Sequence, residues 1–173
     1  EEGNDLQDSF LENIEDHCLD PSDVKCSEGW IPPKYLKDHE AIHEQENKHP
    51  NSLRKAILNF IISCSIRNLR GHIKQHKSML IHASRFVDVQ NKVHNQIENL
   101  IQYFRNKITS KNEQFLAEIE EVWEQQFVRY KDKAEERLPT FNEILNEEKG
   151  LSWTIIEVSK NIKRLNGSYK FIR

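Results

Sequence analysis

The stretch PNSLRKAILNFIISCSIRNLRG, residues 50–71, decides the fold because its apolar side chains would lie on every side of a helix. The apolar positions are Leu53, Ala56, Ile57, Leu58, Phe60, Ile61, Ile62, Cys64, Ile66 and Leu69. A helix without a polar face is largely buried, so other elements must cover it. Asn51 or Ser52 is expected to cap its first turn, and Gly71 is expected to end it.

Apolar residues at spacings of three and four predict further amphipathic helices downstream. They cover residues 84–109 and 112–137, and a third helix is expected to begin at Pro139 and to end at Gly150. A short helix capped by Ser152 follows. The chain is therefore expected to be mainly α-helical.

A small sheet is expected beside these helices. Met79 to Ala83 form an apolar run whose length suits a buried strand, and Ser84 stands where a helix cap belongs. A strand followed by a capped helix is the opening of a βα unit. Near the end, Asn166-Gly167 is typical of a tight turn between two short strands. The predicted fold class is mainly α with a small sheet, an α/β arrangement.

The first 49 residues differ from the rest because they are acidic and poor in apolar positions. We expect a short helix within residues 1–20, a proline-containing loop over 21–36 and a polar helix or linker over 37–49. The predicted organisation is an acidic N-terminal helix and linker, residues 1–49, followed by one region, residues 50–173.

Several features suggest where the protein works. No run reaches the roughly 18 apolar residues of a membrane-spanning helix, so a membrane span is excluded. The start, EEGNDLQDSF, lacks the basic and apolar segments of a signal peptide and an initiator Met, so we interpret Glu1 as a cut end. Three cysteines, an odd number, argue against a disulfide framework and favour a reducing compartment. We expect an internal piece of a larger cytoplasmic protein and assign no oligomeric state.

Charge alternates in blocks along the chain. Residues 1–50 hold 14 acidic and 4 basic residues, residues 51–111 hold 2 and 11, residues 112–150 hold 11 and 5, and residues 151–173 hold 1 and 5. The basic block could attract a polyanion. Alternatively, acidic and basic blocks face each other inside one fold, and the sequence leaves both interpretations open.

Two neighbouring segments carry a resemblance to a known family. PNSLRKAILNFIISCSIRNLRG is followed by HKSMLIHASRFVDVQNKV, whose junction reads Met79, Leu80, Ile81, His82, Ala83, Ser84 and Arg85. A Ser-Leu helix opening, a long apolar helix and a Met-Leu-Ile-His-x-Ser-Arg junction resemble the Z-one domain family. The resemblance covers roughly residues 50–170.

This resemblance implies a context for the chain. Members of the family accompany helicase-like ATPases of superfamily two, are often described as candidate endonucleases, and occur in bacterial modification or defence loci. The matched strand and helix resemble the start of a helicase second lobe, which would be incomplete here, with residues 112–150 as a helical insertion. The family's Gly-rich Ser-Arg-Gly and Gln-x-x-Gly-Arg segments are not found in this sequence. We therefore expect this chain alone to be inactive and to hold no cofactor, with ATP and magnesium acting on the larger protein.

The junction residues His82, Ser84 and Arg85 are candidates for binding nucleic acid. A helix start presents free amides to an anion, and Arg85 could add a bidentate contact to a phosphate. DNA would then be held through its backbone, without reading of its sequence. Alternatively, Ser84 caps the helix and Arg85 pairs with Asp88.

Arg67, Arg70 and Lys74 extend the candidate interface upstream, where His72, His76 and Lys77 add to a basic loop. The loop could follow a nucleic-acid backbone or could be simply solvated. Arg67 falls on an apolar side of its helix and needs a partner there. A carboxylate, the terminal carbonyls of the helix or a bound phosphate could serve.

Other chemistries find little support in the sequence. No GxxxxGK[ST] loop, GxSxG elbow or HExxH motif occurs. Cys18, Cys26, His39 and His43 could be drawn as a zinc set, but the spacing of the two cysteines differs from that of zinc sites. The acidic residues Glu118, Glu120, Glu121 and Glu124 have the spacing of a solvated helix face. We assign no catalytic residue and no metal ligand.

The expected role is nucleic-acid contact and coupling to the rest of a helicase-associated parent protein. The alternative is a helical protein–protein interaction module without nucleic-acid binding, in which the acidic block 112–150 would be the docking face. Binding to a nucleic-acid backbone weakens steeply with salt, so salt dependence separates the two hypotheses.

Overall fold

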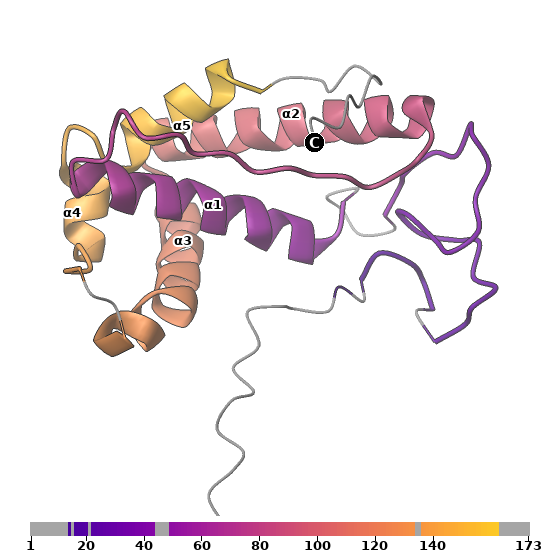
Figure 1. Ribbon diagram of the computed structural model, residues 1–173, viewed down its shortest axis with the longest axis horizontal. Coiled ribbons are helices and arrows are strands. Elements are labelled where there is room, and N and C mark those ends of the chain that lie inside the picture. The colour runs from indigo at the N-terminus through magenta and orange to yellow at the C-terminus, as the bar shows by residue number, and fades with distance from the viewer. Residues whose placement is uncertain (1–13, 15, 21, 44–48, 134–135, 163–173) are drawn as a thin grey trace, which may run out of the picture.

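The structure is a computed structural model that describes residues 14, 16–20, 22–43, 49–133 and 136–162. Within these residues it is helical and contains no strand (Figure 1). The elements are α1 (Asn51–Leu69), α2 (Val87–Thr109), α3 (Glu113–Gln126), the 3-10 helix η1 (Val128–Lys133), α4 (Phe141–Asn146) and α5 (Leu151–Lys160).

The central helix is α1, as its sequence predicts. Its buried positions include Ile57, Leu58, Ile61 and Ile62, which are at most 2% exposed. The predicted side-chain cap at Asn51 or Ser52 is wrong, because the helix begins at Asn51 and Pro50 takes the cap position. Its first turn is instead bound from outside: the Ser52 amide and hydroxyl both donate to the Asp16 carboxylate, at 2.9 and 2.5 Å.

The end of α1 follows the prediction. Gly71 has a φ of +84°, in the left-handed region that glycine adopts without strain. Its amide donates to the Asn68 carbonyl at 2.9 Å, and the His72 amide donates to the Arg67 carbonyl at 2.9 Å. The turn therefore satisfies carbonyls that the helix end leaves unpaired.

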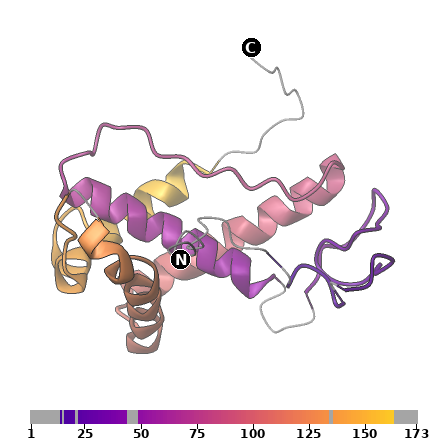
Figure 2. The same cartoon turned by 60° about the horizontal axis from the view of Figure 1, so that its bottom comes forward.

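The other helices are arranged around α1. Helix α5 packs against both α1 and α2, α3 packs against α1, and α4 lies against α1 and α5, whereas α1 and α2 have little direct contact (Figures 1 and 2). The side chains of Phe104, Ile119, Ile144 and Ile155, one from each of the covering helices, are fully buried in one continuous core.

The predicted helix ends need corrections. The helix expected over residues 84–109 begins at Val87, and the helix expected over 112–137 ends at Gln126 before a 3-10 turn. Gly150, not Ser152, takes the cap position of α5. The helix expected from Pro139 covers only 141–146, where Thr140 and Glu143 cap it reciprocally.

The predicted strand at Met79–Ala83 is wrong. Residues 72–86, here called the strap, run in an extended path back along the length of α1 to the start of α2 (Figures 1 and 2). Ile81 and Ala83 pack against the core while Leu80 is 65% exposed, so the side chains alternate as in a strand. A strand also needs a neighbouring backbone to pair with. None of the described residues supplies one, since no backbone–backbone hydrogen bond reaches residues 76–84.

The fold class is corrected accordingly. The described chain is helical, not an α/β arrangement, and the sheet of a helicase-like second lobe is not formed in it. The two strands predicted around Asn166-Gly167 lie outside the described residues. Of the predicted N-terminal helix, residues 1–13 lie outside them too, and residues 16–20 form turns.

The N-terminal segment is joined to the helices by polar contacts. The Trp30 indole N–H donates to Gln96 of α2 at 2.8 Å, and its side chain is 7% exposed. Lys92 of α2 pairs with Glu40 and donates to the Asp38 carbonyl. These bonds attach the described part of residues 14–43 to the outer side of the helical core.

One ion pair connects three helices. Arg54 of α1 donates to both carboxylate oxygens of Glu118 on α3, at 2.6 and 2.7 Å. Its guanidinium also lies 4.9 Å from the ring centre of Phe104 on α2 and 5.5 Å from that of Phe115 on α3. The Arg54 side chain is 13% exposed and that of Glu118 is 36% exposed, so the pair is half-buried.

Replacing Arg54 by alanine is expected to reduce the free energy of unfolding by about 2 kcal/mol. The loss combines two charge-assisted hydrogen bonds with the contacts to the aromatic rings, and partial hydration of the freed Glu118 offsets some of it. Urea unfolding followed by circular dichroism measures the change. Lys160→Ala, which breaks a pair of exposed residues with Glu157, should change the value by less than about 0.5 kcal/mol. Equal effects of the two variants would contradict the assignment.

Replacing Glu143 by glutamine should alter how stability depends on pH. The Thr140 amide, 2.7 Å from Glu143 Oε2, and the Arg137 guanidinium lower the pKa of Glu143 from 4.5 to about 2. A depressed folded-state pKa stabilises the protein above the unfolded-state pKa, and this stabilisation is lost as pH falls towards about 2. The variant should be less stable at neutral pH, and its difference from the wild type should shrink below about pH 4.5.

Urea unfolding at a series of pH values tests this expectation. Glu148→Gln, at an exposed site, is the matched control. A difference between wild type and Glu143→Gln that stays constant from neutral to acidic pH would exclude the proposed role of this carboxylate.

Candidate nucleic-acid interface

Ser84 has a structural role at the start of α2. The residue is 3% exposed, and its hydroxyl accepts hydrogen bonds from the Phe86 amide and the Tyr35 hydroxyl, both at 3.0 Å. Its carbonyl accepts a bond from the Gln90 side chain. Phe86 takes the cap position of the helix, so the predicted cap at Ser84 is two residues early. The Ser84 hydroxyl is therefore occupied by protein groups.

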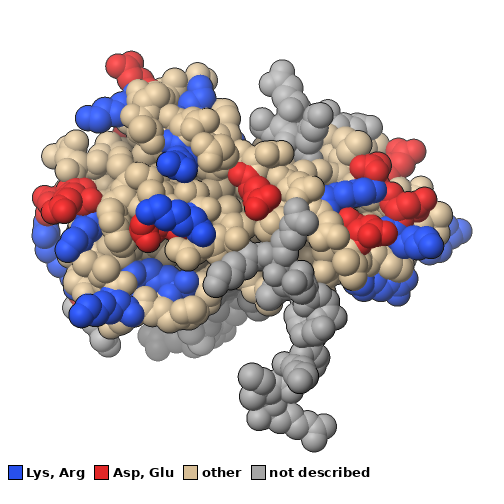
Figure 3. Space-filling model, turned by 90° about the horizontal axis from the view of Figure 1, so that it is seen from above, with Lys and Arg blue, Asp and Glu red and all other residues tan. Residues whose placement is uncertain are grey.

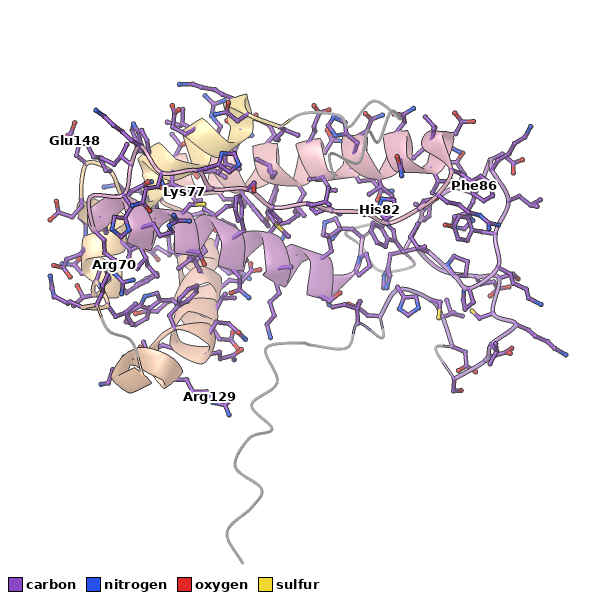
Figure 4. All side chains as sticks on the ribbon, viewed as in Figure 1. Arg70, Lys77, His82, Phe86, Arg129 and Glu148 are labelled. Carbon is purple, nitrogen blue, oxygen red and sulfur yellow. The ribbon has the colours of Figure 1, made fainter. Side chains whose placement is uncertain are left out.

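Arg85 and His82 lie on the surface on either side of Ser84. The Arg85 guanidinium lies 4.8 Å from the ring centre of its neighbour Phe86. The considered ion pair with Asp88 is not formed, and both residues are exposed. His82 is exposed and lies on the strap in Figure 4. Both side chains can be reached by a ligand from solvent.

The upstream candidates divide into two engaged cations and one exposed cation. Arg67 donates to the Gln75 side chain at 3.0 Å, a partner that the sequence reasoning did not consider. Arg70 donates to the carbonyls of Glu136 and Arg137, both at 3.0 Å, and lies 3.3 Å from the Glu136 carboxylate. Lys74 is exposed, and none of the described residues pairs with it.

The candidate residues do not converge on one point. Arg70 at the end of α1 is followed along the strap by Lys77, His82 and Phe86, up to the start of α2 (Figure 4). On the face seen from above, basic and acidic side chains are interspersed towards both ends of the molecule (Figure 3). The geometry is that of an extended line of separated cations, with no enclosed phosphate site.

A cavity of about 1040 Å³ lies between the strap and helices α1, α2 and α5. Its walls include Phe60 and Cys64 of α1, Val93 and Ile97 of α2 and Trp153 of α5. The strap thus runs along a space that α1 and α2 leave between them.

Polar groups inside this region were missed by sequence reasoning. The Lys77 ammonium donates to the Asn68 side chain at 2.6 Å, and burial lowers the pKa of Lys77. The Asn68 amide in turn donates to the Thr154 hydroxyl at 2.9 Å, which joins α1 to α5. The available signal was Asn68 between the apolar residues Ile66 and Leu69, since a buried amide requires partners.

The zinc and nuclease arrangements are not formed. The described residues contain no group of three or more His, Cys, Asp or Glu that could hold a metal ion. The Nε2 atoms of His39 and His43 form hydrogen bonds with the backbone carbonyls of Trp30 and Asp16, respectively. Of the acids considered for catalysis, Glu118 pairs with Arg54 and the other three are exposed on α3.

Among the described helices, none combines the length and the apolar character that crossing a membrane requires.

Comparison with known families identifies the chain. The family model described as "Z1 domain" matches residues 52–170, which is more than half of the sequence. The chain belongs to the Z1 domain family. The resemblance inferred from the α1 segment and the Met79–Arg85 junction is thereby confirmed. No curated protein and no solved structure matches the chain.

For this Z1 domain, replacing Ser84 by alanine tests whether the junction is structural. The change leaves the Phe86 amide and the Tyr35 hydroxyl without their acceptor, so the free energy of unfolding should fall by about 1–2 kcal/mol. Urea unfolding gives the value. Lys74→Ala, at an exposed site on the same strap, should stay within about 0.5 kcal/mol of wild type. A stability unchanged by Ser84→Ala would remove this residue from the framework of the junction.

Proposed function

We propose that this Z1 domain contacts nucleic acid through the strap and couples that contact to the rest of a helicase-associated protein. The observation that carries the proposal is the charge of residues 70–86, which include Arg70, Lys74, Lys77 and Arg85 and no acidic residue. Of these, Lys74 and Arg85 are exposed, and exposed cations attract the backbone of a polyanion. ATP and magnesium would act on other parts of the larger protein.

The candidate residues would have different parts in this proposal. Lys74, His82 and Arg85 are exposed and would contact phosphates directly. Arg67 and Arg70 hold the two loops next to the end of α1, and Ser84 holds the start of α2, so these three residues would position the strap. Backbone contacts of this kind do not read base sequence.

The small number of exposed cations sets the expected strength of binding. Each phosphate contact to duplex DNA contributes about −0.9 to the slope of the logarithm of affinity against the logarithm of salt concentration. Two or three contacts from the strap predict a slope between about −2 and −3. Such binding would be weak by itself and would depend on further contacts from the larger protein.

Fluorescence anisotropy with labelled duplex and single-stranded DNA, at several salt concentrations, tests the proposal. Lys74→Glu and Arg85→Glu should each weaken binding and reduce the salt slope by about 1. Arg129→Glu makes the same change in net charge, but at a site that lies below α3 and away from the strap (Figure 4). It is therefore the matched control. Equal losses in all three variants would show an effect of net charge alone, and absence of binding at low salt would reject the proposal.

A second candidate function is favoured by the backbone of the strap. Its residues 76–84 are extended, make no backbone–backbone hydrogen bond with described residues and border the large cavity. An exposed extended segment can add a strand from another polypeptide. On the alternative acidic docking face, Glu118, Glu136 and Glu143 are engaged within the chain, whereas Glu120, Glu121 and Glu124 stay exposed. Partner binding that withstands both high salt and the charge reversals would favour this function over contact with nucleic acid.

A further inference from the structure

The cavity beneath the strap has the size and the walls of a small-molecule site. Its volume of about 1040 Å³ lies at the upper end of the range for ligand pockets, about 300–1,000 Å³. Each element around it contributes apolar side chains, among them Phe60 of α1, Val93 and Ile97 of α2, Trp153 and Val158 of α5 and Ile81 of the strap. Walls of this kind favour a hydrocarbon chain over a strongly hydrated ligand.

One cation in the cavity wall, Lys77, has no carboxylate partner. Its ammonium donates to the side-chain oxygen of Asn68 at 2.6 Å, and Asn68 is 4% exposed, so Lys77 reaches inward from the strap to α1 (Figure 4). The charged groups that act on Lys77 are Cys64 and Arg67, and no acid of the described chain is among them. Glu157, the acidic residue among the described wall residues, pairs with Lys160 at 2.9 Å.

The half-buried ammonium of Lys77 is therefore short of a counter-charge. Taking a charge out of water costs free energy unless an opposite charge compensates for it. Asn68 occupies one of the three N–H donors that an ammonium carries. A carboxylate that entered the cavity would supply the missing charge and accept a charge-assisted hydrogen bond from Lys77.

The strap leaves a route into the cavity. Its residues 76–84 form no backbone–backbone hydrogen bond with the described residues, and the side chains of Met79 and Leu80 are 36% and 65% exposed. Displacing this part of the strap would break few hydrogen bonds, whereas the helices on the other sides of the cavity belong to the core. A ligand can thus enter beside the strap without unfolding of α1, α2 or α5.

We propose that the cavity binds a single-chain amphiphile with a carboxylate head group, such as a fatty acid. The head group pairs with the Lys77 ammonium, and the hydrocarbon chain lies against the apolar side chains of α1, α2 and α5. This site goes beyond the proposed contact with nucleic acid, for which Lys74, His82 and Arg85 at the exposed surface are the candidates. Its anchor is instead the half-buried Lys77.

The test compares three ligands with the same ten-carbon chain and different head groups. Isothermal titration calorimetry of the full chain is carried out with decanoate, decanol and decyltrimethylammonium below their critical micelle concentrations. Decanoate should bind at least about tenfold more tightly than decanol, the ratio expected for one hydrogen bond to a charged group, and the cationic amphiphile should bind most weakly. Equal affinities would overturn the proposal, because they would reflect the chain alone, and so would absence of decanoate binding.

A pair of variants tests the assignment of the head group to Lys77. Lys77→Met should weaken binding of decanoate by about tenfold and leave binding of decanol nearly unchanged, a difference that a general loss of structure would not produce. Lys55→Met removes the same charge at an exposed site of α1 that does not line the cavity, and should leave both affinities unchanged. Equal effects of the two variants on decanoate would contradict the assignment. The comparison of ligands needs no substitution and stands if Lys77→Met fails to fold.

Tryptophan fluorescence shows whether the chain lies in the cavity. Bromine atoms on a stearate chain quench an indole that they touch, and Trp153 lines the cavity whereas Trp30 and Trp123 do not. A dibrominated stearate should therefore quench the wild-type protein, and Trp153→Phe should remove most of the quenching. Quenching that persists in this variant would place the chain elsewhere and overturn the proposal.

Discussion

The structure depends on the burial of α1, of whose residues only Asn51 and Lys55 are exposed. One covering helix cannot satisfy such a surface, so elements from the whole described chain meet on it. Polar contacts decide where they lie: Arg54 binds Glu118 of α3, Asn68 binds Thr154 of α5, and Ser52 binds Asp16 of the N-terminal segment. Each contact fixes one neighbour of α1, because a half-buried charge or amide is costly without its partner.

The strap follows from the same constraint. It leaves α1 at Gly71, must reach the start of α2 at the other end of the molecule, and covers the space between the two helices on the way. Arg70, just before the strap, binds the protein itself, since it holds the loop at Glu136 and Arg137. The cations that stay exposed, Lys74 and Arg85, are therefore the groups on which a contact with nucleic acid would depend.

The N-terminal segment shows how a small part of the chain gains a defined geometry from the core. Its own hydrogen bonds pair residues 17–19 with residues 28–31, and its attachments through Asp16 and Trp30 hold that arrangement against α1 and α2.

The sequence by itself determined the buried α1, its end at Gly71, the existence of the helices after it and the Z1 family, because these depend on local spacing of apolar residues and on a contiguous motif. Tertiary structure alone decided whether Met79–Ala83 becomes a strand, since an extended segment needs a neighbouring backbone that no local pattern can supply. It also decided which cations are exposed and that Ser84 binds Tyr35. Those outcomes depend on residues far apart in the chain, so no local pattern of the sequence predicts them.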